Sequence, residues 1–179
     1  MTMNEKKLMG IRIIVHRGTN QIGGCVTEYE CRGFHLFVDY GEQLPGYEHT
    51  EMEIEGLTKG DVSNSALLIT HYHGDHIGKV SELSSEIPVY MGKTGCEICQ
   101  EFELHMSHIP GEEGKRHRLM ADRVAEFKHF EPGQTFEVGP FKIVPIVMGH
   151  SAFDSYAFKI EADGRKIFHT GDFRTHGFR

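Results

Sequence analysis

The stretch "LLITHYHGDHIGKV", residues 67–80, decides how this sequence is interpreted. An apolar run typical of a buried strand is followed within six positions by His71, His73, Asp75 and His76. Because side chains alternate along a strand, His71 and His73 are predicted to project to the same side. We expect Gly74, which lacks a side chain, to let the backbone turn sharply, so that Asp75 and His76 face the same pocket from a following helix.

The residue types in this cluster indicate metal binding. Imidazole nitrogen and carboxylate oxygen are ligands that zinc accepts, and a site without thiolates leaves the ion a stronger Lewis acid. The alternative is a polar loop that is rich in histidine by chance. The strand before the cluster and the helix after it favour the metal site.

Length and composition describe one globular domain. The chain has 179 residues, of which 39% are hydrophobic and 25% charged, enough for a core of its own. A formal net charge of −7 excludes a protein that is basic throughout and holds nucleic acid by charge alone, but not a local basic groove. No apolar stretch suits a signal peptide or a membrane span of about 18 residues. We therefore expect a cytoplasmic protein without membrane contact.

The four cysteines do not suggest a second metal site. Cys96 and Cys99 form one CxxC within "KTGCEICQEFELHM", which is typical of a helix, and no second CxxC exists. We interpret them, and Cys25 and Cys31 on a predicted strand, as reduced thiols that pack inside the domain.

The order of predicted elements indicates an α/β fold. Apolar and polar residues mix at strand spacing near both ends of the chain, and Asp163-Gly164 suits a two-residue hairpin turn. We expect a mixed, largely antiparallel sheet with helices on one face. The expected strands fall at residues 11–19, 24–41, 65–70, 87–92, 135–148 and 155–172, with helices at 76–86 and 93–128 interrupted by a loop at 109–118.

These motifs carry a family resemblance. The pattern H-x-H-x-D-H after an apolar strand resembles the signature of the metallo-β-lactamase superfamily, whose members are αββα sandwich hydrolases with one or two metal ions. Asp39 in "LFVDYG" resembles the early structural aspartate beneath the metal site. His150 in "VMGHSAFDS" resembles the next metal histidine, and Asp172 in "FHTGDFR" the bridging carboxylate. The resemblance spans about residues 11–179.

Further details resemble one branch of that superfamily. The segments "GTNQIGGCVTEYE", "GHSAFDSYAF" and "GDFR" are similar to those of the ribonuclease J-like, or β-CASP, RNA-processing nucleases. Members that act on small substrates, such as thioesterases and lactonases, share the metal motif but less of these surroundings. The resemblance therefore implies RNA as the substrate.

The resemblance also implies a role for each matched residue. His71, His73 and His150 would hold one zinc ion, and Asp75 and His76 a second, with Asp172 between them. Manganese or iron could replace zinc. Asp75 and Asp172 would be the catalytic carboxylates, and a metal-bound hydroxide would attack the phosphodiester.

Three further residues are expected around the metals. Asp39 would fix the ligand histidines in place. Ser151 and Ser155 are candidates to cradle a phosphate, although serines that cap a turn are an equally good interpretation.

The sequence departs from the family pattern after its fourth motif. A complete domain continues with more strands and helices and a final metal histidine, and ribonuclease J-like proteins also carry an inserted β-CASP domain. We expect residues 1–179 to form one truncated domain without a β-CASP domain, which either forms a homo-oligomer or belongs to a longer protein. The first metal site would be complete and the second would lack a ligand. The hypotheses are therefore the N-terminal half of a nuclease, a small-substrate hydrolase, or a catalytically silent metal-binding domain.

Overall fold

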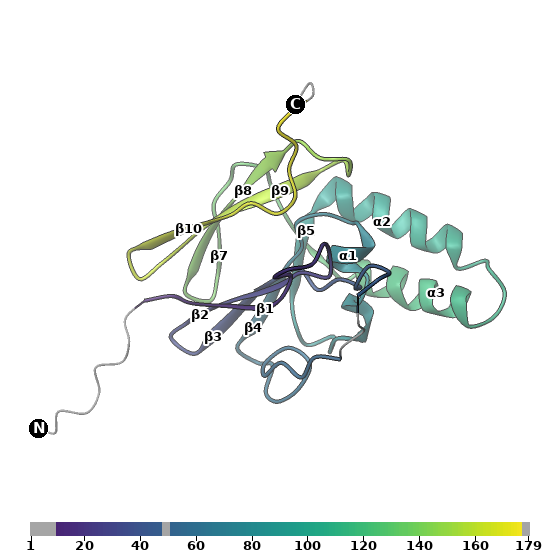
Figure 1. Ribbon diagram of the computed structural model, residues 1–179, viewed down its shortest axis with the longest axis horizontal. Helices are drawn as coiled ribbons and strands as arrows, with labels where there is room; N and C mark the ends of the chain where they lie inside the picture. Colours follow the sequence, from purple (N-terminus) through teal and green to yellow (C-terminus); the bar gives the residue numbers. More distant parts are fainter. Residues whose placement is uncertain (1–9, 48–50, 177–179) are drawn as a thin grey trace, which may run out of the picture.

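The computed structural model describes residues 10–47 and 51–176, which form two facing β-sheets with a pair of helices outside one of them (Figure 1). The first sheet has the order β1-β2-β3-β4-β5-β6 and the second the order β10-β9-β8-β7. The first sheet contains β1 (Arg12–Arg17), β2 (Val26–Cys31), β3 (Phe34–Val38), β4 (Ser65–Leu68), β5 (Val89–Gly92) and β6 (Lys128–Phe130). The second contains β7 (Phe136–Val138), β8 (Phe141–Met148), β9 (Ser155–Ala162) and β10 (Arg165–His169).

The first sheet changes direction at its centre. β1, β2 and β3 pair antiparallel, whereas β3, β4, β5 and β6 pair parallel. The second sheet is antiparallel throughout. Five of the eight pairings are thus antiparallel, which confirms the mixed, largely antiparallel arrangement.

The helices cover only the outer face of the first sheet. They are α1 (Gly74–Ile77), α2 (Lys93–Met106) and α3 (Glu112–Val124), with a 3-10 turn, η1 (Val80–Glu82). None of the helices in the described ranges has the length and hydropathy needed to cross a membrane.

Two apolar layers hold these elements together. One lies between the first sheet and the helices and includes Phe37 and Leu67, while the other lies between the sheets and includes Leu68 and Phe158. All four residues of β4 are buried, since each face of this central strand meets one layer. This double burial explains the continuous apolar run before His71.

The predicted helix at residues 76–86 is wrong. The structure has the short helix α1, which begins before it, then η1, and Leu83 is already extended. Arg123 from α3 donates hydrogen bonds to the carbonyls of Ser84 at 3.3 Å and Ile87 at 2.8 Å. A distant guanidinium therefore satisfies two backbone acceptors of the segment that follows η1.

The predicted loop at residues 109–118 is also too long, because α3 begins at Glu112. Glu112 and Glu113 lie in its first turn, where negative charge is favourable near the positive end of the helix dipole. A Cβ on Gly114 would lie 1.9 Å from the carbonyl oxygen of Ile109, so glycine allows this turn to pack on the preceding loop.

Other sequence predictions are confirmed. Asp163 and Gly164 both have positive φ, 47° and 69°, and join β9 to β10 as a two-residue turn. Cys96 and Cys99 are free, buried and part of the helix-side layer.

Candidate metal centre

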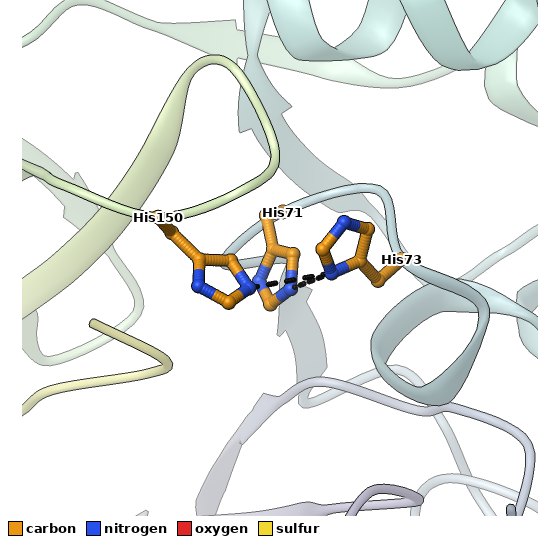
Figure 2. A group of neighbouring side chains, drawn as sticks. All are labelled: His71, His73 and His150. Atoms are coloured by element: carbon orange, nitrogen blue, oxygen red, sulfur yellow. Dashed lines mark hydrogen bonds between the residues drawn. The ribbon is translucent and has the colours of Figure 1, made fainter. Parts of the chain in front are cut away.

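Three histidine nitrogens converge at the end of the central strands. His71 and His73 follow β4, and His150 follows β8 of the other sheet (Figure 2). His71 Nε2 lies 3.0 Å from His73 Nδ1, which lies 3.3 Å from His150 Nε2. Two nitrogens bound to one tetrahedral zinc at about 2.05 Å would be about 3.3 Å apart. The three side chains are therefore spaced to share one ion.

Asp172 lies beside this cluster and extends it. Its Oδ2 is 3.7 Å from His150 Nε2 and 3.6 Å from His76 Nε2. His76 Nε2 is also 3.7 Å from Oδ2 of Asp75. Ligand atoms of His71, His76 and Asp172 all lie within 4.8 Å of one another. The carboxylate of Asp172 thus lies between the three-histidine group and the His76–Asp75 pair, the position expected for a bridging ligand.

Asp39 lies beneath the cluster and orients His76. Its carboxylate is 1% exposed and accepts hydrogen bonds from Thr70 N at 2.8 Å and His76 Nδ1 at 2.7 Å. Because Nδ1 of His76 donates to Asp39, Nε2 is the nitrogen directed toward Asp172 and Asp75, where an ion would bind. The geometry therefore agrees with the role expected for Asp39.

Thr70 extends this hydrogen-bond network to His71. Its hydroxyl donates to Asp39 Oδ2 at 2.8 Å and lies 3.0 Å from His71 Nδ1, from which it can accept. That tautomer leaves Nε2 of His71 free to bind an ion. Sequence analysis did not identify Thr70, because a threonine at the end of a strand gives no signal of its own.

The protonation states also suit metal binding. Burial, together with the charges of His76 and other neighbouring histidines, lowers the pKa of His71 to about 3, and burial and His150 lower the pKa of His73. Both imidazoles are therefore neutral near neutral pH, as ligands must be. Burial opposes the charge on His76, but Asp39, Asp75 and Asp172 outweigh it and raise the pKa of His76 to about 9. An ion that binds this side chain near neutral pH must therefore displace the proton on Nε2.

Gly41 allows the segment that follows β3 to lie against the backbone of α1. A Cβ there would lie 1.9 Å from the backbone carbon and oxygen of Asp75. Gly74, in contrast, has open space around a Cβ and its φ is outside the left-handed region. The expectation that the turn needs a glycine at position 74 is therefore wrong, and the close contact that needs one is at Gly41.

The loop that carries His150 is fixed by two contacts. Phe153 N donates to the hydroxyl of Tyr72 at 2.9 Å, which ties the loop to the residue between His71 and His73. Asp154 Oδ2 accepts from Gly95 N at 2.8 Å in the first turn of α2. These contacts hold His150 beside the other ligands, and the sequence alone gave no sign of them.

The two serines of this loop differ. Ser155 is buried and its hydroxyl donates to the carbonyl of Ala152 at 2.9 Å, so it stabilises the turn and does not face the cluster. Ser151 is exposed next to His150. His169 bonds to another side chain, with Nδ1 2.8 Å from the hydroxyl of Tyr29, and is not part of either group of potential ligands in the described residues.

Comparison with known proteins places the chain in a family. Residues 48–177 match the family model described as a beta-lactamase superfamily domain. The chain belongs to the beta-lactamase superfamily. Two solved structures have a similar fold. One is a protein of unknown function from Enterococcus faecalis, with a TM-score of 0.74 and 21% identity over 93% of this chain and 44% of its own. The other is the metallo-beta-lactamase fold protein YhfI from Bacillus subtilis, with a TM-score of 0.57 and 20% identity over 90% of this chain and 62% of its own.

Curated superfamily relatives are similar at the sequence level. Ribonuclease J of Mycobacterium tuberculosis is 27% identical over 177 residues, which cover 92% of this chain and 28% of the relative. A metal-dependent hydrolase of Bacillus pumilus is 27% identical over 161 residues, 84% of this chain and 60% of the relative. The chain thus spans little more than a quarter of that ribonuclease J. The family match thus covers the segment that carries the His/Asp cluster, and that cluster is a group of side chains that could hold a metal ion.

Proposed function

We propose that this chain provides the metal centre of a phosphodiester hydrolase that acts on RNA, as its similarity to ribonuclease J suggests. The observation that carries the hydrolytic part is the position of Asp172 Oδ2, 3.7 Å from His150 Nε2 and 3.6 Å from His76 Nε2. A carboxylate between three histidines on one side and the His76–Asp75 pair on the other is a donor arrangement that suits a two-metal hydrolytic site.

The proposed ligand sets follow from the geometry. His71, His73 and His150 would hold one ion, and Asp75 and His76 a second, with Asp172 shared between them. The ions would be zinc, with manganese or iron as alternatives, since the ligands are nitrogen and oxygen only. When bound, such ions lower the pKa of a coordinated water and stabilise charge on phosphoryl oxygens.

The protein's own groups would prepare the site for this chemistry. Asp39 and Thr70 hold His76 and His71 with their Nε2 atoms toward the ions. The side chain of Asp172 is 48% exposed, so the carboxylate that the two ions would share is open to solvent and to a substrate.

A second candidate is a hydrolase of small substrates such as thioesters or lactones. Two observations favour it, namely the similarity to the metal-dependent hydrolase of Bacillus pumilus and a largely apolar pocket beside His73. An acyl group could occupy such a pocket.

One experiment separates these candidates. The protein, purified without chelator and supplied with zinc, is assayed with 5′-phosphorylated RNA, a thioester and a lactone, beside Asp172→Asn. We expect zinc-dependent RNA cleavage that falls by a factor of about 100 or more in the variant. Glu28→Gln changes a buried carboxylate outside the cluster and serves as the matched control. Turnover of the thioester or lactone alone would favour the second candidate. Zinc binding without turnover of any substrate would refute both and favour the catalytically silent metal-binding domain.

A further inference from the structure

A pocket of about 430 Å³ adjoins the candidate metal centre on its helical side. His73, a proposed metal ligand, lines it together with Tyr72, and its other walls come from Glu42, α1, η1 and the α2–α3 pair. Ile77, Ile98 and Met120 make the walls largely apolar. Its size and position suit one flat or apolar group of a substrate whose reacting bond lies at the metal centre.

An exposed aromatic ring dominates the helical end of this pocket. Phe102 of α2 is 56% exposed although it lies between two helices. Its ring meets His117 of α3 edge to face, with centroids 6.4 Å apart and planes at 84°. His117 Nδ1 donates in turn to Glu103 Oε2 at 2.6 Å. The ring is therefore fixed before anything binds, and its free face remains available for stacking.

A cation lies at the same end. Arg116 lines the pocket and has no ion-pair partner among residues 10–47 and 51–176, whereas its helix neighbours Lys115 and Arg118 pair with Glu112 and Asp122. A free guanidinium can bind a phosphate through two parallel hydrogen bonds or stack on a base. Glu103 is engaged by His117, with 2.6 Å between Oε2 and Nδ1, and forms no ion pair with Arg116 in the part of the chain that the structure describes.

We propose that this pocket binds one nucleobase of the RNA strand next to the phosphodiester held at the metal centre. The base stacks on Phe102, and Arg116 contacts an adjacent phosphate of the strand. Glu42 on the wall can accept a hydrogen bond from an exocyclic amino group of the base. Stacking on an aromatic ring and contact with an arginine are the usual means by which proteins hold single-stranded RNA. This inference rests on the proposed RNA substrate.

The chain offers a direct binding test because it contains no tryptophan. Phe102→Trp places a single fluorophore in the pocket, and Leu119→Trp places one on the same helix pair, at a residue that is 64% exposed and not part of the pocket lining. Adenosine monophosphate and ribose 5-phosphate, which lacks the base, are titrated into both variants. We expect saturable quenching only by adenosine monophosphate and only in Phe102→Trp, weakened about tenfold when Arg116→Ala is added. Equal quenching by ribose 5-phosphate, or none by either ligand, would overturn the base pocket.

A kinetic arm distinguishes failure of the pocket from failure of the proposed function. Phe102→Ala is expected to lower kcat/KM for 5′-phosphorylated RNA about tenfold, with Leu119→Ala unchanged. Both side chains are exposed, so neither change should prevent folding. If wild type, Phe102→Ala and Leu119→Ala cleave RNA equally well, the inference that the pocket binds a base is wrong and the proposed function stands. If the wild-type protein cleaves a thioester but not RNA, both are wrong, and loss of thioester turnover in Phe102→Ala would assign the pocket to an acyl group.

Discussion

Asp39→Asn is the substitution that most sharply separates positioning from metal ligation. The asparagine oxygen can still accept from Thr70 N, but the amide nitrogen that replaces Oδ2 cannot accept from His76 Nδ1. The Thr70 hydroxyl can still donate to the remaining oxygen, which is 3.1 Å away, so the main loss is the buried, charge-assisted hydrogen bond from His76. Such a bond corresponds to about 1.5–3 kcal/mol of the free energy of unfolding. With a slope of about 2 kcal/mol per molar urea, the unfolding midpoint should fall by about 1 M.

The same substitution should weaken metal binding without removing a ligand. Loss of a group that orients a ligand histidine typically lowers metal affinity by a factor of about 10–100. The affinity is measured by competition with a zinc-responsive dye and the stability by urea unfolding of the metal-free protein, each beside wild type.

Glu28→Gln is the matched control. Glu28 is also a buried carboxylate, 3% exposed, that bonds to two histidines, with Oε2 2.6 Å from His16 Nε2 and Oε1 2.7 Å from His35 Nδ1. We expect it to lose a similar amount of stability and to keep its zinc affinity. If Asp39→Asn binds zinc as tightly as wild type, or if both variants lose affinity equally, the argument that Asp39 orients His76 is refuted.

Three other expectations follow from the geometry. Gly41→Ala, which drives a Cβ into the backbone of Asp75, should lower the free energy of unfolding by about 3 kcal/mol in urea titrations, while Gly74→Ala should leave it nearly unchanged. Asp154→Asn should lower the zinc affinity, because Asp154 holds the loop of His150, with only a small change in the melting temperature. A variant with the zinc affinity of wild type would contradict the role of Asp154 in holding this loop. As the pH is lowered from 6.5 to about 3, His71 binds a proton in the unfolded chain but not in the folded one. The free energy of unfolding of the metal-free protein should therefore fall over this range. As the pH is raised from 6.5 to about 9, His76 keeps its proton in the folded protein and loses it in the unfolded chain, so the free energy of unfolding should also fall over this range. Urea titrations at a series of pH values should therefore show a maximum near pH 6.5.

The parts of the fold that follow from local pattern could be predicted from the sequence. The alternation and length of the apolar runs predict the strands, and Asp163-Gly164 predicts the hairpin because few other pairs adopt its backbone angles. The cluster at residues 71–76 could be located because a strand and a turn bring its ligands together within one local segment. His150 and Asp172 could be matched only through the family resemblance, since their place depends on the other sheet.

Features created by contacts across the fold could not be predicted. Arg123, which is far along the chain, donates to the backbone of the segment where a helix was predicted. Tyr72 and Asp154 hold the loop of His150, but tyrosine and aspartate are common residues and their presence does not predict these contacts. Gly74 was chosen as the essential glycine because it lies within the motif, but the backbone contact that requires glycine is made by Gly41. No periodicity in the sequence records such contacts.

Metal content per chain, measured by elemental analysis after purification without chelator, tests the central claim most directly. We expect at least about one divalent ion per chain in the wild-type protein, and we expect it to be lost in His73→Ala because Nδ1 of His73 lies between His71 and His150. His16→Ala, which removes a histidine outside the cluster, should retain the ion. A wild-type protein without bound metal, or equal metal in wild type and His73→Ala, would contradict the account.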